Sequence, residues 1–203
     1  MIIPEPIPIT HRQLYILGRQ ARGQIKCLYL HWTADHYGQV HDAYHINIDR
    51  DGTIYQTCSK LTQLKQHTYM RNPGSIGIAL CCGYQAVCHD SGKVNLGVEP
   101  PTAAQIDALA QVIAILTYAL GLPLAYATVK THAEIACMDG YGPGSGDRDM
   151  RWDLWYLPDA LDNHRLRLGG VLLREKALRY RDHFFYPKQL PLLEEAVQPC
   201  LCA

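Results

Sequence analysis

The chain has 203 residues, of which 48% are hydrophobic and 19% are charged, and its formal net charge at pH 7 is zero. This length suits one domain with a sizeable core and room for a short appendage, and the balanced charge gives no indication of nucleic-acid binding. No apolar run is long enough to predict a membrane span. Residues 1–10 lack the basic region and long apolar segment of a signal peptide, so we expect synthesis in the cytoplasm.

The N-terminal half predicts one short helix followed by strands. Residues 11–22 can form a helix capped by Thr10. Four stretches after it have the apolar or alternating pattern of strands, and Arg50-Asp51-Gly52 predicts a hairpin turn between the second and the third. These stretches are residues 25–32, 43–50, 53–57 and 75–81.

The clearest helix in the sequence covers residues 102–120. Thr102 can cap its start, and Gly121 with Pro123 can end it. Its apolar residues recur at spacings of three and four, which gives the helix one face to lie on a sheet.

Strands come first in this chain and helices follow, which is typical of an α/β (mixed α+β) fold with a central mixed β-sheet flanked by helices. Beyond the long helix we expect a short strand over residues 125–131 and a helix over 152–161. We divide the chain into an N-terminal extension (1–24), a domain (25–161) and a C-terminal helical extension (162–203) packed on that domain.

Residues 131–154 have almost no regular hydrophobic period and combine a histidine with several acids and glycines, which predicts an irregular functional loop. A catalytic zinc site needs three protein ligands and an open position. His31 and His132 each end a predicted buried strand, so both side chains could project from one rim of the sheet, and Asp147 could supply a third ligand. Because a single histidine is more often structural than a ligand, residue types alone leave this metal site a hypothesis.

Six sequence blocks keep their order over about residues 25–160 and together resemble the zinc N-acetylmuramoyl-L-alanine amidases. This family is shared by phage lysozyme-type amidases and peptidoglycan recognition proteins. The blocks are His31-Trp32-Thr33, Ala43-Tyr44-His45-Ile46, Asp51-Gly52-Thr53-Ile54-Tyr55, Ser75-Ile76-Gly77-Ile78-Ala79-Leu80, the helix after Thr102, and Thr131-His132. The family fold is a central mixed sheet flanked by helices, in agreement with the pattern of predicted elements.

The resemblance implies that His31 and His132 are zinc ligands. The third family ligand is Asp or Cys and precedes an aromatic–Asp pair that opens the last helix. Matching Trp152-Asp153 to that pair places the ligand at Asp147, with Asp149 and Cys137 as the alternatives.

The resemblance also implies catalytic residues. Tyr44 matches a tyrosine that lies beside the metal-bound water and stabilises the transition state. Ser145, two residues before Asp147, takes a position at which relatives have lysine or threonine, and Ala79 stands where some relatives have glutamate. These two departures leave the identity of the general base open.

Three further residues are candidates for substrate binding. His67 and Asn72 fall in a segment that often lines the substrate groove in this family, although an exposed loop histidine is equally compatible with the sequence. Trp32 could stack on a sugar ring or pack in the core below the metal.

The function implied by the resemblance is zinc-dependent hydrolysis of the amide between N-acetylmuramic acid and the L-alanine of the peptidoglycan stem peptide. Without a signal peptide, such an enzyme would reach the cell wall or periplasm after lysis, as a phage endolysin, or after delivery as a secreted antibacterial effector. Residues 162–203 could then bind a delivery or immunity protein, or simply wrap the domain. The alternatives are a non-catalytic peptidoglycan-binding module and a cytoplasmic amidase that recycles muropeptides.

Overall fold

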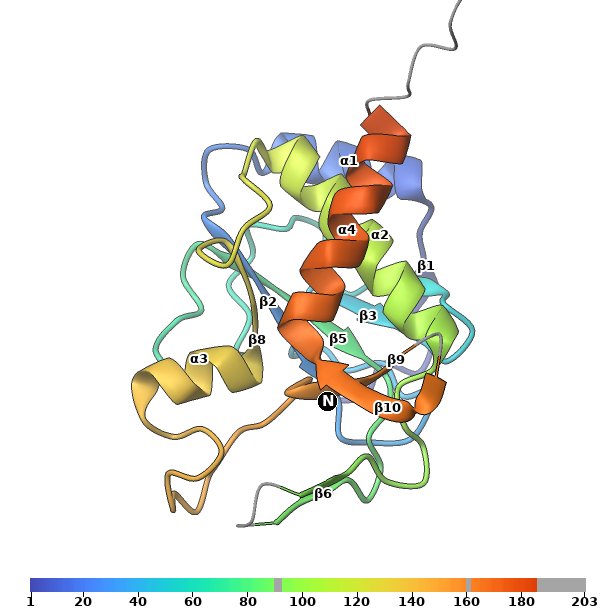
Figure 1. Ribbon diagram of the computed structural model, residues 1–203. Helices are drawn as coiled ribbons and strands as arrows, with labels where there is room; N and C mark the ends of the chain where they lie inside the picture. The colour runs from blue at the N-terminus through green and yellow to red at the C-terminus, as the bar shows by residue number, and fades with distance from the viewer. Residues whose placement is uncertain (90–92, 160–161, 186–203) are drawn as a thin grey trace, which may run out of the picture.

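The computed structural model describes residues 1–89, 93–159 and 162–185, and its centre is a six-stranded mixed sheet (Figure 1). The four strands β3, β5, β2 and β8 are parallel, while β4 and β1 join the β3 edge in antiparallel orientation. In spatial order the strands are β1 (Ile7–Pro8), β4 (Ile54–Gln56), β3 (Ile46–Ile48), β5 (Ser75–Leu80), β2 (Cys27–Trp32) and β8 (Val129–Thr131).

Four helices accompany this sheet in the described residues, and two small antiparallel hairpins lie outside it. The helices are α1 (His11–Gln20), α2 (Ala103–Leu120), α3 (His132–Asp139) and α4 (Gly169–Phe185). The hairpins pair β6 (Val87–Cys88) with β7 (Val94–Asn95), and β9 (Tyr156–Asp159) with β10 (Asp162–Leu168). The predicted fold class, a mixed α/β fold with a central sheet flanked by helices, is confirmed.

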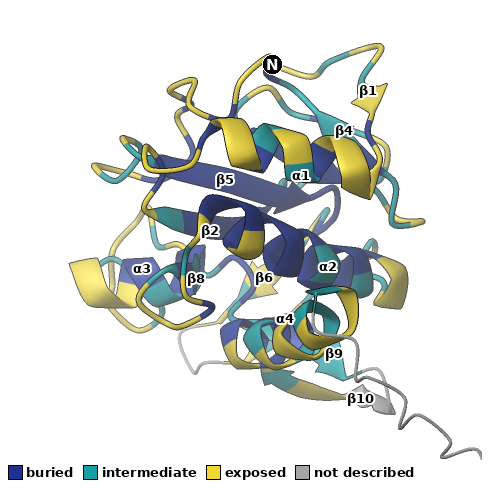
Figure 2. Ribbon diagram, turned by 90° about the horizontal axis from the view of Figure 1, so that it is seen from above, coloured by how far each residue is buried: buried dark blue, intermediate teal, exposed yellow. Residues whose placement is uncertain are grey.

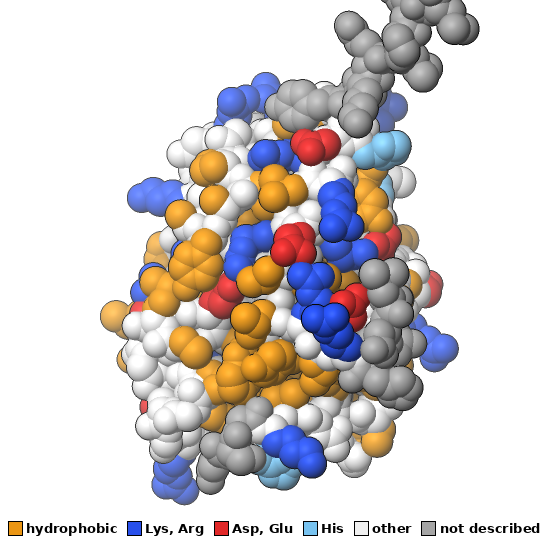
Figure 3. All heavy atoms as spheres, viewed as in Figure 1, with side chains coloured by type: hydrophobic (Ala, Val, Ile, Leu, Met, Phe, Trp, Pro, Cys, Tyr) orange, Lys and Arg blue, Asp and Glu red, His pale blue; other side chains and the backbone are white. Residues whose placement is uncertain are grey.

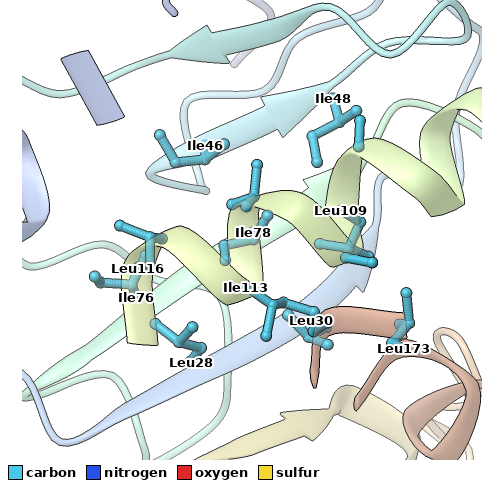
Figure 4. Packing of buried hydrophobic residues seen from close by; sticks show 14 of the residues in the cluster. Leu28, Leu30, Ile46, Ile48, Ile76, Ile78, Leu109, Ile113, Leu116 and Leu173 are labelled. Carbon is cyan, nitrogen blue, oxygen red and sulfur yellow. The ribbon is translucent and has the colours of Figure 1, made fainter. Parts of the chain in front are cut away.

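The hydrophobic core lies between the sheet and α2. Successive side chains of a strand point to opposite faces, and the even-numbered residues of β2, β3 and β5 all pack on the α2 side (Figure 4). The side chains of Leu28, Leu30, Ile76 and Ile78 are fully buried there. Each such side chain contributes roughly 1.5–3 kcal/mol by leaving water, so this face carries much of the stability of the domain.

Helix α2 is apolar on nearly all sides because the sheet covers one of its faces and α1 and α4 cover others (Figure 2). Among the described residues it is the one helix whose length and composition would allow it to cross a membrane, and 72% of it is buried inside the fold. Its all-round apolar surface is therefore that of a helix at the centre of a protein core.

Both N-terminal caps proposed from the sequence are present. The side chains of Thr10 and Thr102 each accept a hydrogen bond from the backbone amide of the third helical residue, which is Gln13 or Gln105. The side chain of that glutamine accepts one in turn from the backbone amide of the threonine, which completes a capping box. Gly121 ends α2 in a left-handed conformation with φ of 74°.

Three stretches differ from the sequence-based expectation. The segment after Thr131 begins with helix α3, because Thr131 and Glu134 form a capping box and Gly140 closes the helix at φ 85°. The helix expected over residues 152–161 is wrong: a turn leads into β9, whose Pro158 cannot continue a helix. The C-terminal extension starts with strand β10 before α4 begins.

The regions proposed as extensions contact the domain directly. Strand β1 pairs with β4 at the sheet edge, α1 packs on α2, and α4 packs on α2 from another side. The division of the chain after residues 24 and 161 stays a prediction.

The side chain of Gln105 connects α2 to the ends of two strands. It is fully buried, and its amide nitrogen donates to the carbonyl oxygens of Ile48, at 3.1 Å, and Cys81, at 3.0 Å. We expect Gln105→Met to lower the free energy of unfolding by about 1–3 kcal/mol, because a buried carbonyl loses its donor. Gln13→Met removes the matching capping contact from an exposed site, so chemical denaturation should show a smaller loss. Equal losses would contradict this role for Gln105.

Candidate active site

The face of the sheet opposite α2 is polar. The odd-numbered residues of β2, β3 and β5 point to this face, and they include His31 on β2 and Ser75 on β5. His67 comes from the loop above this face, and its ring lies near Tyr29, with the ring centroids 6.1 Å apart. Because side chains alternate between the two faces along a strand, the register that buries the leucines of β2 against α2 places His31 on the opposite face.

Three side chains converge at one point on this face. His31 Nδ1 lies 3.1 Å from His132 Nδ1 and 3.5 Å from Asp153 Oδ2, and His132 Nδ1 lies 3.2 Å from the same carboxylate oxygen. Within the described ranges, this is the one group of at least three His, Cys, Asp or Glu side chains arranged to hold a metal ion.

The spacing of these atoms fits zinc. In a tetrahedral site with metal–ligand distances of about 2.0–2.1 Å, two ligand atoms lie roughly 3.3–3.4 Å apart. The three separations here, 3.1, 3.2 and 3.5 Å, bracket that value. Two histidines and one carboxylate are also a common ligand set for catalytic zinc, in which the fourth position is left for water.

Strand pairing brings the two histidines together. Strands β2 and β8 are parallel neighbours, and Leu30 is paired with Thr131. The next residue along each segment, His31 near the end of β2 and His132 just after β8, therefore lies beside the other. His132 is also the first residue of α3. Glu134 anchors this helix start, because it accepts hydrogen bonds from both terminal nitrogens of Arg174 on α4 at 2.8 and 2.9 Å.

Asp153 is held by the backbone around it. Its carbonyl accepts a hydrogen bond from the Ala133 amide at 3.2 Å, next to His132. The following residue, Leu154, is fully buried and has a φ of 56°, which is strained for a non-glycine residue. Gly169 allows this arrangement, because a Cβ there would lie 2.1 Å from the Leu154 carbonyl oxygen.

The electrostatics suit a divalent cation. Burial lowers the pKa of His31 to about 4, so the ring is neutral at pH 7 and keeps a lone pair for a metal. Burial alone would raise the pKa of Asp153, but His132 and His31 hold it below its ordinary value. The site thus offers neutral imidazole and carboxylate, the forms in which these groups bind metals.

A cavity of about 950 Å³ opens beside this cluster, and His132 lies in its wall. One side is formed by the loop that carries His67, Thr68 and Asn72. The other side is polar and comes from the segment after α3. Its residues are Tyr141, Asp147, Asp149 and Arg151. The cavity is large enough for part of an extended peptide or a sugar.

Tyr44 lies next to the cluster. Its ring centroid is 5.1 Å from that of His31, and its hydroxyl donates a hydrogen bond to the Trp32 carbonyl at 3.3 Å. Burial raises the pKa of Tyr44, with a smaller contribution from Asp153, so the hydroxyl stays protonated and can donate a hydrogen bond at neutral pH.

The structure does not bring Asp147 to the two histidines. Asp147 is exposed, its amide donates to Ser145 Oγ at 3.2 Å, and both residues belong to a surface loop. The alternatives Asp149 and Cys137 are exposed as well. Asp153 takes the third place in the cluster. The sequence-based choice read Trp152-Asp153 as the start of a helix, whereas these residues form a turn that directs the Asp153 carboxylate inward.

The three residues expected to bind substrate have different environments. Trp32 is 4% exposed and packs edge-on against Trp152 at 4.7 Å between ring centroids, so it belongs to the core. His67 and Asn72 do line the cavity. The side chain of Asn72 accepts hydrogen bonds from the amides of His67, at 3.0 Å, and Thr68, at 2.8 Å, which orders the loop.

Comparison with known families shows to which of them the chain belongs. The sequence model of the N-acetylmuramoyl-L-alanine amidase family matches residues 21–145, more than half of the chain. The chain therefore belongs to this amidase family, and the resemblance drawn from its sequence blocks is confirmed. The protein is an enzyme of the peptidoglycan amidase class.

The chain is also similar to several solved structures. One is the N-acetylmuramoyl-L-alanine amidase LysC from Clostridium intestinale URNW, with 19% identity and a TM-score of 0.41 over 55% of this chain and 72% of LysC. Another is the Ph2119 endolysin from the Thermus scotoductus MAT2119 bacteriophage Ph2119, with 20% identity and a TM-score of 0.38 over 54% of this chain and 72% of the endolysin. PGRP-Hd from Alvinella pompejana has 18% identity and a TM-score of 0.36 over 63% of this chain and 76% of its own. No curated protein matches the chain significantly.

The identity of the third ligand can be tested with two aspartate variants. If Asp153 completes the donor set, Asp153→Ala should lose stoichiometric zinc, because two histidines alone leave the site one ligand short. Asp147→Ala should keep zinc, since its side chain is exposed on the cavity wall. Metal analysis of both purified variants distinguishes them, and zinc loss in Asp147→Ala alone would restore the sequence-based choice.

Proposed function

We propose that the chain is a zinc-dependent amidase that hydrolyses the amide bond between N-acetylmuramic acid and the L-alanine of the peptidoglycan stem peptide. The observation that carries this proposal is the convergence of His31, His132 and Asp153 at tetrahedral spacing beside a large cavity. Membership of the amidase family supports the choice of bond.

The chemistry requires a stronger nucleophile than neutral water and a partner for the charge that develops on the carbonyl oxygen. His31, His132 and Asp153 would hold a zinc ion, which would lower the pKa of a bound water to about 7 and polarise the substrate carbonyl. The Tyr44 hydroxyl, protonated at neutral pH, would turn its proton from the Trp32 carbonyl toward the developing oxyanion and donate a hydrogen bond to it.

Arg151 is the proposed second stabilising group, in place of Ser145. With Asp153 as third ligand, Arg151 stands two residues before it, where the resemblance places lysine or threonine in relatives. Arg151 lines the cavity next to His132 and Tyr141, whereas Ser145 does not reach the cavity wall. A guanidinium at this position offers a fixed positive charge to the oxyanion.

We expect Arg151→Ala to lower kcat by about 10²–10³-fold, in the range measured for loss of one oxyanion donor. Zinc content should be unchanged, because Arg151 is not one of the three converging side chains. Ser145→Ala is the matched control and should keep wild-type kcat. A large loss in the control with none in Arg151→Ala would return the role to Ser145.

The bond specificity can be tested by digesting purified peptidoglycan and analysing the products by mass spectrometry. We expect stem peptides that begin at L-alanine, and none from His132→Ala, which removes one of the three converging ligand atoms. Cleavage between sugars or within peptide cross-links would refute the proposal.

Two other functions remain distinguishable from this one. A non-catalytic peptidoglycan-binding module is disfavoured because all three donor positions are filled, and it would bind muropeptides without releasing peptide. A muropeptide-recycling amidase would cut soluble fragments and leave intact sacculi untouched. We propose the lytic role, as an endolysin or a delivered antibacterial effector acting on the cell wall, so activity on intact sacculi is the deciding measurement.

A delivery or immunity protein is proposed to contact the C-terminal region. In its described part, residues 162–185, basic and acidic side chains alternate on the outer side of α4, and a group of hydrophobic side chains lies below them (Figure 3). Leu168 at the end of β10 and Val171 in the first turn of α4 are exposed, at 51% and 39%. The rest of the proposed contact region, residues 186–203, lies outside the described residues.

A further inference from the structure

The second ring nitrogen of His31, Nε2, points away from the cluster that His31 forms with His132 and Asp153, here called the metal-type cluster. It begins a line of polar groups. We propose that a hydrogen-bond chain from His31 through Thr68, His67 and Ser75 to a backbone carbonyl positions His31 and fixes its tautomer for metal binding. This inference rests on the proposed zinc site, and it assigns His67 and Thr68 a positioning role that the sequence analysis did not foresee.

The chain has five contacts within hydrogen-bond distance. His31 Nε2 lies 3.3 Å from Thr68 Oγ1, and the same hydroxyl lies 3.0 Å from His67 Nδ1. His67 Nε2 lies 3.4 Å from Ser75 Oγ, which donates to the Asn72 carbonyl at 2.8 Å and to the Arg71 carbonyl at 3.1 Å. The four linked residues, His31, Thr68, His67 and Ser75, are all buried.

The carbonyl at the far end determines the direction of every bond. A backbone carbonyl only accepts, so the Ser75 hydroxyl must donate to it, and Ser75 Oγ then accepts from His67 Nε2–H. A neutral His67 protonated at Nε2 has a bare Nδ1, which accepts the Thr68 hydroxyl proton.

The same logic reaches the metal-type cluster. Because the Thr68 proton is used toward His67, the Thr68 oxygen accepts from His31 Nε2–H. A neutral His31 protonated at Nε2 keeps its lone pair on Nδ1, the atom that faces His132 and Asp153. The backbone carbonyls of Arg71 and Asn72 thus set the tautomer of His31. They act through the side chains of Ser75, His67 and Thr68.

The surrounding residues are shaped to hold this chain. A Cβ on Gly77 would lie 2.5 Å from His67 Cγ, so only glycine leaves room for the ring above β5. His45, a neighbouring buried histidine, has both nitrogens engaged elsewhere: Nε2 donates to the Gln63 carbonyl at 2.7 Å, and Nδ1 accepts from the Gly77 amide at 3.0 Å. His45 therefore does not compete for Thr68 or Ser75.

His67 and Thr68 also line the cavity, so an activity loss alone could come from lost substrate contact. The test therefore measures zinc affinity without substrate, by competition with a chromophoric chelator. Thr68→Val keeps the shape of the side chain and removes the hydroxyl, and we expect it to weaken zinc binding by about 10–100-fold, the usual effect of removing a partner of a metal-ligating histidine. Thr68→Ser keeps the hydroxyl and should bind zinc within about threefold of the wild type.

A purely structural role for Thr68 would lower the melting temperature of the metal-free protein and leave the zinc affinity of the folded fraction unchanged. Wild-type affinity in Thr68→Val would therefore overturn the inference. Absence of zinc binding in the wild-type protein would instead overturn the proposed zinc site itself, so the two failures are separate.

The tautomer can be observed directly in the metal-free protein. Long-range ¹H–¹⁵N correlation spectra at pH 7 should show His31 and His67 protonated at Nε2 and bare at Nδ1. Ser75→Ala removes the link to the backbone carbonyls, and we expect a second tautomer of His67 to become populated. A wild-type His31 protonated at Nδ1 would contradict the proposed direction of the chain.

Discussion

Parallel pairing of β2 with β5 on one side and β8 on the other is the constraint on which the site depends. It aligns the ends of β2 and β8, so that His31 near the end of β2 and His132 just after β8 lie side by side. It also fixes which face each side chain takes, because a shift of one residue would exchange the apolar and polar faces. The leucines and isoleucines packed against α2 hold that register, and the histidines on the opposite face depend on it.

Several histidines and hydroxyl groups are buried on the polar face, which would be costly without partners. Here the cost is offset because each group has an assigned donor or acceptor. His45 bonds to the backbone, Ser75 bonds to the loop carbonyls, and Thr68 joins two histidine rings. A network of this kind is rigid when complete and destabilising when one member is lost. The rigidity suits a metal site, which needs its ligand atoms held close to their final positions before the ion arrives.

The third member of the cluster is positioned by different means. Asp153 lies in a turn, next to a buried residue in the left-handed region, and that turn is held against Gly169 at the start of α4. Helix α4 also binds Glu134 through Arg174 and so fixes the start of α3 that carries His132. The C-terminal region, which lies beyond the match to the family model, thus supports two of the three candidate ligands.

The sequence by itself determined five of the six strands of the central sheet, the two capped helices and the family, because these depend on local patterns of apolar residues, caps and turn residues over short windows. It also determined His31 and His132 as candidates, since each lies at the end of a recognisable strand. The tertiary structure decided the third residue of the cluster: three aspartates lie within seven positions, and only the turn at Leu154 directs one of them inward. It also decided the role of His67, because the hydrogen bonds that join it to Thr68 and Ser75 link a loop to a strand in a way that no local pattern records.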